Sequence, residues 1–209
     1  MNDDGFRTEQ EAFWAGDFGK EYSKRNVGSD LLAGNCALFA RILRRTHNVH
    51  SIIEFGANIG LNLKALELLV PDVEQAAIEI NPDAATALRA WGRAEVFELS
   101  ILEFNPIHTW DLVLIKGVLI HVNPAELDVV YSKLFDSSAR YIVIAEYYNP
   151  TPVTVPYRGH QDRLFKRDFC GEMLDKFPAL TLLDYGFSYH RDANFPQDDI
   201  TWFLLEKQR

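Results

Sequence analysis

A glycine-rich turn near residue 55 is the part of the sequence whose residue types and spacing most directly suggest chemistry. The apolar run Ser51–Phe55 is typical of a buried strand, and Gly56 and Gly60 follow it just before a helical pattern begins. Such a turn lets a ligand approach the backbone, and the next helix offers free N–H groups at its N-terminus. The dinucleotide fingerprint needs glycine at positions 58 and 61, but the chain has Asn58 and Leu61, so we expect no grip on a pyrophosphate.

Two acidic residues accompany the turn. Glu54 precedes it within the strand, and a carboxylate there suits a cationic ligand better than a diphosphate. Glu79 ends the next apolar run, where it is placed to accept hydrogen bonds from both ribose hydroxyls of an adenosine. The alternatives are that Glu54 interacts with a helix dipole and that Glu79 only ends a strand near solvent.

The sequence from Glu54 to Gly60 reads acidic-x-Gly-x-x-x-Gly, which resembles motif I of the S-adenosylmethionine-dependent methyltransferases of the Rossmann-like class. The resemblance implies S-adenosyl-L-methionine as the cofactor, bound by the turn and by the ends of later strands. Related enzymes often have an acid at the position of Ser100, so here we expect adenine to meet a backbone amide and Ile101. The residues that we expect to bind the cofactor are Glu54, Gly56, Ala57, Asn58, Gly60, Glu79, Ile80, Ser100, Ile101, Lys116 and Gly117.

From residue 48 onward, short β-rich runs alternate with helical patterns, which is typical of a parallel sheet covered by helices. We expect strands near residues 51–55, 75–80, 94–97, 111–116 and 141–146. Two final strands near residues 180–188 and 200–205 have no helix between them and should pair antiparallel. Residues 147–158 are predicted to form a long loop, because they include three prolines and show no helical period.

The pattern predicts an α/β protein with a mostly parallel seven-stranded sheet and an antiparallel C-terminal strand. Together with the resemblance at motif I, it implies a three-layer Rossmann-like methyltransferase fold. We expect one domain over residues 1–209, with a helical N-terminal extension at 1–47 and a Rossmann-like core at 48–209. Trp14, Phe18 and Tyr22 recur at a spacing of four on one face of that extension. They predict either core packing or a lid over the cofactor, formed by Trp14, Tyr22 and Arg25.

Several segments together resemble one narrow family, the pseudaminic acid biosynthesis-associated methylases. These segments are residues 11–22, 54–62, 117–124, 146–150 and 165–169, so the resemblance spans nearly the whole chain. It implies a methyltransferase-like protein associated with the biosynthesis of nine-carbon acidic sugars. The family is defined by association, and the acceptor and the atom that is methylated stay open.

Methyl transfer needs a general base only where the acceptor is a hydroxyl or a protonated amine. The candidates for that role are His121, Tyr148, His160 and Asp162. His121 stands out among them because the ordinary pKa of histidine lies near neutrality. The alternative is a structural histidine that packs behind the cofactor.

The segment from Tyr157 to Arg167 has four fixed positive charges and one acid, although the chain as a whole is acidic. Arginine suits carboxylate and phosphate groups, so this local excess predicts a small anionic acceptor, a sugar acid or a nucleotide-linked sugar. We expect Tyr147, Arg158 and Arg163 to bind it. The alternative is that these charges pair with acids elsewhere on the protein surface.

The composition limits the other functions. A net charge of −9 makes nucleic acid an unfavourable partner. The sequence has no apolar run long enough for a bilayer, no leader pattern and no CxxC motif, so we expect a cytoplasmic monomer or homodimer without metal or membrane partner. Two other functions are considered, a non-catalytic S-adenosylmethionine-binding or regulatory subunit and an NAD-dependent oxidoreductase, and the failed dinucleotide fingerprint speaks against the second.

Overall fold

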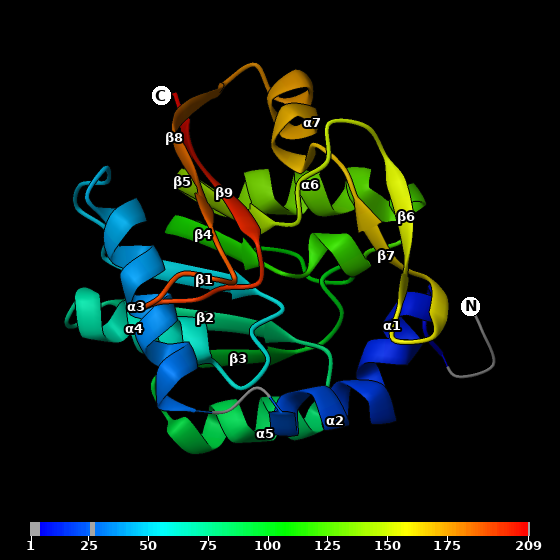
Figure 1. The fold of residues 1–209 in the computed structure, drawn as a ribbon. Coiled ribbons are helices and arrows are strands. Elements are labelled where there is room, and N and C mark those ends of the chain that lie inside the picture. Colours follow the sequence, from blue (N-terminus) through cyan, green and yellow to red (C-terminus); the bar gives the residue numbers. More distant parts are fainter. Residues whose placement is uncertain (1–4, 26–27, 209) are drawn as a thin grey trace.

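A seven-stranded sheet lies at the centre of the computed structural model, which describes residues 5–25 and 28–208 (Figure 1). Its strand order is β3-β2-β1-β4-β5-β9-β8, and β9 runs antiparallel to both of its neighbours. The strands are β1 (Ser51–Phe55), β2 (Glu74–Glu79), β3 (Glu95–Glu98), β4 (Trp110–Lys116), β5 (Ser138–Glu146), β8 (Leu180–Ser188) and β9 (Ile200–Lys207). The predicted Rossmann-like sheet with an antiparallel C-terminal strand is confirmed.

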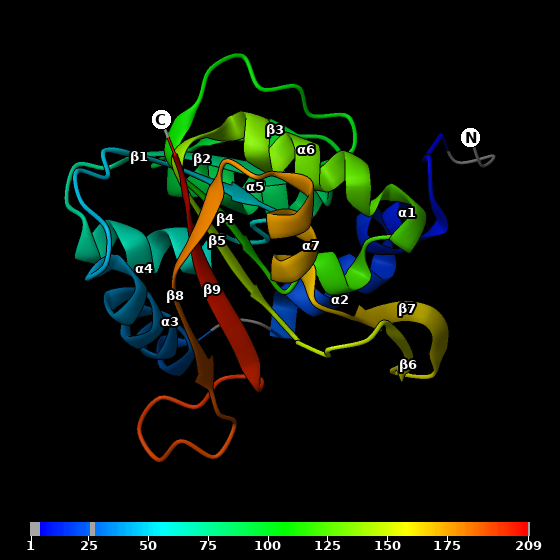
Figure 2. The same cartoon turned by 90° about the horizontal axis from the view of Figure 1, so that it is seen from above.

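Helices cover both faces of this sheet (Figures 1 and 2). One face packs against α3 (Ser29–Leu43), α4 (Leu61–Leu69) and α5 (Pro82–Trp91), and the other against α6 (Leu127–Ser137) and α7 (Phe169–Lys176). Alternate strand residues serve the two faces, so Ile52 packs on α3 and α4 while Ile53 packs on the side of α6. Within the described residues, no helix is long and apolar enough to cross a membrane.

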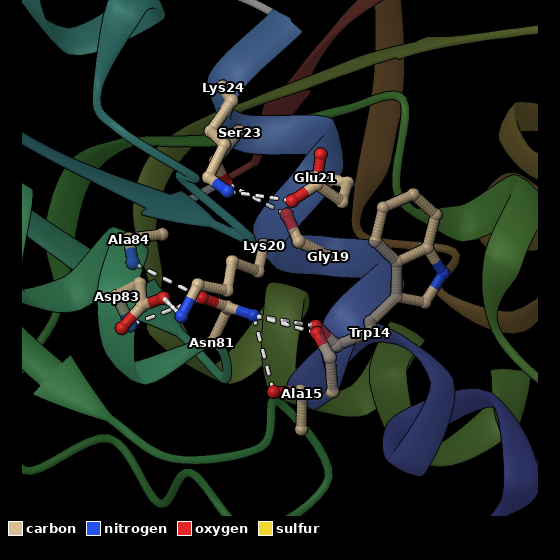
Figure 3. A network of polar contacts seen from close by, with 11 residues as sticks. Trp14, Ala15, Gly19, Lys20, Glu21, Ser23, Lys24, Asn81, Asp83 and Ala84 are labelled. Atoms are coloured by element: carbon tan, nitrogen blue, oxygen red, sulfur yellow. Dashed lines mark hydrogen bonds and ion pairs between the residues drawn. The ribbon is translucent and has the colours of Figure 1, made fainter.

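Two short helices, α1 (Glu9–Ala15) and α2 (Asp17–Arg25), pack against the N-terminus of α5 (Figure 3). Asn81 joins them, because its Oδ1 accepts hydrogen bonds from the N–H groups of Asp83 (3.1 Å) and Ala84 (3.2 Å) while its Nδ2 donates to the carbonyls of Trp14 (3.1 Å) and Ala15 (3.2 Å). One side chain therefore satisfies the start of α5 and the end of α1.

The segment predicted as a long loop, residues 147–158, contains the first strand of a β-hairpin. Strands β6 (Val153–Tyr157) and β7 (His160–Lys166) pair antiparallel and stand apart from the main sheet (Figures 1 and 2). Arg158 and Gly159 connect them with positive φ angles of 48° and 84°, as tight hairpin turns require. The prolines concealed this pattern; Pro156 is compatible with the hairpin because the pairing is irregular between Val155 and Tyr157.

Replacing Asn81 by aspartate should separate its two roles. Aspartate keeps the oxygen that caps α5 but cannot donate to the carbonyls at the end of α1. We therefore expect the amides of α1 and α2 to exchange with solvent about tenfold faster, which is roughly 1.4 kcal/mol, while α5 stays protected. Native-state hydrogen exchange measures both, and Asn81→Ala, which loses both roles, should expose α5 as well. Unchanged exchange of α1 and α2 in Asn81→Asp would contradict the bridging role.

Candidate functional site

A cavity of about 450 Å³ lies at the carboxyl ends of the parallel strands, where α/β sheets of this kind bind their ligands. Its second wall comes from α1 and α2, and the loop between β8 and β9 closes a third side. The sheet side is lined by Gly56, Ala57, Asn58, Glu79, Ile80, Ser100, Ile101, Lys116 and Gly117, all of them predicted cofactor contacts. The other two predicted contacts, Glu54 and Gly60, do not line the cavity, and each has a different part in the turn.

The turn after β1 is folded onto β2. The N–H groups of Gly56 and Ala57 both donate to the carbonyl of Ile78, at 2.9 and 3.0 Å. Gly56 has a φ of 77°, and a Cβ there would lie 2.6 Å from Cγ2 of Val118. Its glycine is thus required by the turn and by close packing on Val118, in addition to any approach of a ligand.

Gly60 and Gly117 show two other uses of positive φ. Gly60 begins α4 in the left-handed conformation, and a Cβ there would lie 2.7 Å from Cδ2 of Leu88 on α5. Gly117 has a φ of 68°, but no atom of the described chain lies within 4 Å of a Cβ built on it. The open approach to the backbone is therefore at Gly117.

The Glu79 carboxylate is held by the backbone around it. Its Oε2 accepts the Asn58 N–H at 2.6 Å and its Oε1 accepts the Asn81 N–H at 2.7 Å. Burial raises the pKa of Glu79, and these backbone hydrogen bonds oppose the rise. Each carboxylate oxygen can accept a second hydrogen bond, so the group can receive two neighbouring hydroxyls from a ligand in the cavity.

Unmet hydrogen-bonding groups gather near the carboxyl ends of β1 and β4. Glu54 is fully buried, and Asn62 donates to its Oε1 at 2.6 Å. The buried Oε2 of Glu54 and Oδ1 of Asn62 accept no hydrogen bond from any described residue. Lys116 lines the cavity and makes no hydrogen bond or ion pair within the described chain. Buried polar groups without partners are rare, and acceptors beside an ammonium form a complementary site for a zwitterion.

Burial sets the charges of these groups. It raises the pKa of the Glu54 carboxyl to about 8, against the opposing effects of the Asn62 hydrogen bond and the positive charge of Lys116. It also lowers the pKa of Lys116, while the negative charges of Glu54, Asp198 and Glu146 act in the other direction. Burial removes water from around Glu54 and Lys116. A ligand that brings an opposite charge close to each of them would favour the carboxylate form of Glu54 and the ammonium form of Lys116.

Sequence reasoning missed two carboxylates that organise the site. Oε1 of Glu146, at the end of β5, accepts the N–H groups of Val118 and Leu119, both at 2.9 Å, and thereby fixes the segment after β4. Glu11 on α1 lines the cavity and accepts the hydroxyl proton of Ser100. The Thr8–Glu11 capping-box pattern is visible in the sequence, but its contact with a residue so distant in the chain is not.

Of the candidates for a general base, His121 is the one that lines the cavity. Its Nδ1 lies 2.5 Å from the carbonyl oxygen of Arg163, and a carbonyl can only accept. Nδ1 therefore carries the proton and Nε2 is left as the acceptor. Burial lowers the pKa of His121 to about 4, so the ring is neutral at pH 7. The ring also lies 4.6 Å from that of Trp14, between centroids.

The remaining candidates lie outside this cavity. The ring of His160 lies 5.0 Å from that of Phe13 on α1, between centroids, and the backbone carbonyl of Asp162 accepts a hydrogen bond from the Gln10 side chain at 3.1 Å. Tyr148 lines a neighbouring cavity. These positions make His160 and Asp162 part of the contact between the hairpin and α1.

Two of the three predicted lid residues line the cavity, and the third does not. Trp14 and Tyr22 line the cavity, with ring centroids 5.2 Å apart in an edge-to-face arrangement. The guanidinium of Arg25 lies 5.9 Å from the centroid of the Phe18 ring and is not among the residues that line the cavity.

A second cavity adjoins the first and shares His190 and Asp198 with it. It is lined by Tyr147, Tyr148, Lys166, Phe187, His190, Asp198, Asp199 and Thr201. Of the predicted acceptor-binding residues, Tyr147 lies here, whereas Arg163 pairs with Glu9 at 3.1 Å and Arg158 lies over the Tyr157 ring at 5.8 Å. The hairpin cation that faces a cavity is thus Lys166, which lies 5.0 Å from the centroid of the Tyr147 ring.

Several methyltransferases are among the solved structures with a similar fold. The 1,6-didemethyltoxoflavin-N1-methyltransferase of Burkholderia thailandensis, with bound 1,6-didemethyltoxoflavin and S-adenosylhomocysteine, is 16% identical with a TM-score of 0.71, over 96% of this chain and 90% of that one. The magnesium protoporphyrin IX methyltransferase of Synechocystis, with bound S-adenosylhomocysteine, is 11% identical with a TM-score of 0.67, over 95% and 98%. The plantazolicin methyltransferase in complex with S-adenosylhomocysteine is 14% identical with a TM-score of 0.66, over 96% and 94%.

These similarities confirm the predicted Rossmann-like methyltransferase fold. No protein-family model matches the chain, and no curated protein sequence does.

Substituting alanine at Gly56 and at Gly117 should distinguish a crowded glycine from an open one. Both have positive φ, so both variants should lose about 1–2 kcal/mol from the free energy of unfolding. Gly56→Ala should lose a further ~1–3 kcal/mol, because its Cβ collides with Val118. Urea unfolding measures the difference, and adding Val118→Ala should recover part of it. Equal losses in the two single variants would show that Val118 does not restrict Gly56.

Proposed function

We propose that the protein is an S-adenosyl-L-methionine-dependent methyltransferase whose acceptor is a small anionic molecule, a sugar acid or a nucleotide sugar of the pseudaminic acid type. The order of chemical groups along the cavity is the observation that carries this proposal. The unmet Oδ1 of Asn62, behind which the buried Glu54 carboxyl lies, and the Lys116 ammonium come first. The Glu79 carboxylate follows, and the apolar side chains of Ile80 and Ile101 line the part of the cavity beyond it.

These groups fit the cofactor from one end to the other. Asn62 would meet the α-ammonium of its amino-acid part, with the negative charge of Glu54 directly behind Asn62, and Lys116 would meet the α-carboxylate. Glu79 would accept hydrogen bonds from both ribose hydroxyls, and the apolar end would enclose the purine. The three similar folds were solved with S-adenosylhomocysteine, which is further support.

When bound, the cofactor supplies a methyl group on a sulfonium as the electrophile. Catalysis of such a displacement depends mainly on holding donor and acceptor in line. In this chain Glu146 fixes the backbone of Val118 and Leu119, and the short 3₁₀ turn η1 (Leu119–His121) then brings His121 to the cavity.

His121 is the proton acceptor that we propose for a hydroxyl acceptor. The carbonyl of Arg163 holds the ring in the tautomer whose Nε2 is free to accept. A pKa of about 4 keeps the imidazole neutral, and therefore able to accept, at physiological pH. Because such a ring is a weak base, it would take the proton only as the bond from oxygen to the methyl group forms.

We place the acceptor across the boundary between the two cavities. Tyr147 and Tyr148 offer aromatic faces in the second cavity, and Lys166 offers a cation that forms no ion pair within the described chain. Arg158 at the hairpin turn would extend this positive surface. Arg163 would act indirectly, because its ion pair with Glu9 fixes α1 against the hairpin. The resemblance to the pseudaminic acid-associated methylases supports a sugar acid as the occupant.

Binding of S-adenosylhomocysteine to the isolated protein tests the cofactor. We expect calorimetry to detect binding of this ligand and none of NAD. Glu79→Gln should weaken binding about tenfold or more, since one acceptor for the ribose hydroxyls becomes a donor. Glu98→Gln is the matched control, because Glu98 ends β3 but pairs with Arg89 on the surface. If the wild-type protein ignores S-adenosylhomocysteine, the proposed function is wrong.

The high pKa of Glu54 predicts a pH dependence of that binding. At pH 7 the carboxyl is mostly protonated, and a ligand ammonium at Asn62, the hydrogen-bond partner of Glu54, would favour the carboxylate and lower its pKa. Binding should therefore release a proton, and affinity should rise by up to about tenfold per pH unit between pH 6 and pH 7.5. Calorimetry in two buffers of different ionisation enthalpy measures the proton release. Glu54→Gln should remove the pH dependence, and a flat profile in the wild type would exclude an ammonium at Glu54.

A further inference from the structure

A carboxylate from α1 reaches the end of the cavity that follows β3. Glu11 stands in the first turn of α1, where its Oε2 accepts the N–H of Thr8 at 2.8 Å. Its other oxygen, Oε1, accepts the hydroxyl proton of Ser100, and both Glu11 and Ser100 line the cavity. Oε1 retains a lone pair for a second donor.

The groups beside Glu11 determine what that donor can be. The Ser100 hydroxyl donates a hydrogen bond to Glu11, and its oxygen accepts one from the Leu102 N–H at 3.0 Å. Ser100 therefore has no donor left for a ligand. The Ile101 N–H donates to no acceptor in the described chain. An acceptor at Glu11 and a donor at Ile101 thus border the same part of the cavity. Adenine presents the matching pair, an exocyclic amine that donates next to a ring nitrogen that accepts.

The polarity of the cavity places the purine at this end. The charged groups Glu54 and Lys116 belong to β1 and β4, and the Glu79 carboxylate lies at the end of β2. Beyond Glu79, the apolar side chains of Ile80, Ile101 and Leu102 line the wall, and Glu11 and Ser100 are the polar pair beside them. A ligand with an amino acid at one end and a purine at the other would therefore place its amino acid near β1 and β4 and its purine near Ile101.

We propose that Glu11 accepts a hydrogen bond from the exocyclic amine of the cofactor's adenine, so that α1 supplies a specificity-determining residue of the cofactor site. The inference rests on the proposed function. It replaces the expectation that a backbone amide and Ile101 alone meet the adenine. The placement of α1 supports it: Arg7 pairs with Glu126 at 2.6 Å, Glu9 pairs with Arg163, and Asn81 holds the end of the helix. A side chain held on a fixed element can discriminate between ligands.

The test compares S-adenosylhomocysteine with its analogue in which hydrogen replaces the exocyclic amine of the purine. The wild-type protein should prefer the amine-bearing ligand about tenfold or more, as expected for a hydrogen bond to a carboxylate. Glu11→Ala should reduce the preference to about twofold or less, and Glu11→Gln should keep an intermediate preference through its amide oxygen. Calorimetry gives each affinity.

Thr8→Ala is the matched control, because it breaks the capping box but keeps the carboxylate, and it should retain the wild-type preference. The preference is a ratio measured on one protein, so partial unfolding of a variant lowers both affinities and leaves the ratio unchanged. Wild-type preference in Glu11→Ala, or equal binding of both ligands by the wild type, would overturn this inference alone. If the wild type binds neither ligand, both this inference and the proposed function are wrong.

Discussion

Two of the loops that line the main cavity are each held by a carboxylate at the end of the neighbouring strand. Glu79 of β2 accepts the N–H of Asn58 in the turn after β1, and Glu146 of β5 accepts the N–H groups of Val118 and Leu119 after β4. Turns at the end of a buried sheet leave backbone donors that must be satisfied without water. Parallel pairing places a strand end beside each of these turns, and an acid at that position meets the need.

This arrangement has a chemical consequence. A carboxylate that holds a loop is buried, and burial raises the pKa of Glu146 to about 7, in the same range as that of Glu54. Lys116 lies among these acids, and their negative charges favour its protonated form. The groups that stabilise the loops therefore also set the electrostatic character of the cavity, and a ligand that brings charge into it changes the ionisation of its walls.

The features that the sequence predicted are those with a short-range signal. The strands and the glycine turn follow from apolar runs and spacing, and the position of Glu79 follows from the end of a strand. Glu54 was expected to contact the ligand directly, but it does not line the cavity; it accepts a hydrogen bond from Asn62 in the first turn of α4, and Asn62 lines the cavity. The hairpin was missed because its prolines outweighed the Arg158–Gly159 turn.

The remaining features depend on contacts between distant parts of the chain, which no local pattern reports. The sequence predicts that Arg163 binds an anionic acceptor, but in the fold Arg163 forms an ion pair with Glu9. Ser100 stands where related methyltransferases often have an acid, and the fold brings the carboxylate of Glu11, from a distant part of the chain, into hydrogen-bond contact with it. Such pairs are fixed by the packing of whole elements, after the elements themselves have formed.

The bridge made by Asn81 has a consequence for biosynthesis on the ribosome. The carbonyl of Trp14 can accept its hydrogen bond from Asn81 only after 67 further residues have been synthesised. The hydrogen bond from the Gln10 side chain forms later still, because its acceptor, the carbonyl of Asp162, is 152 residues further along the chain. Chains emerge from the ribosome N-terminus first, so α1 and α2 leave it without the surface on which they pack. Helices α1 and α2 are synthesised before the sheet but are then among the last elements to dock, and the cavity gains its second wall only when most of the sheet is already in place.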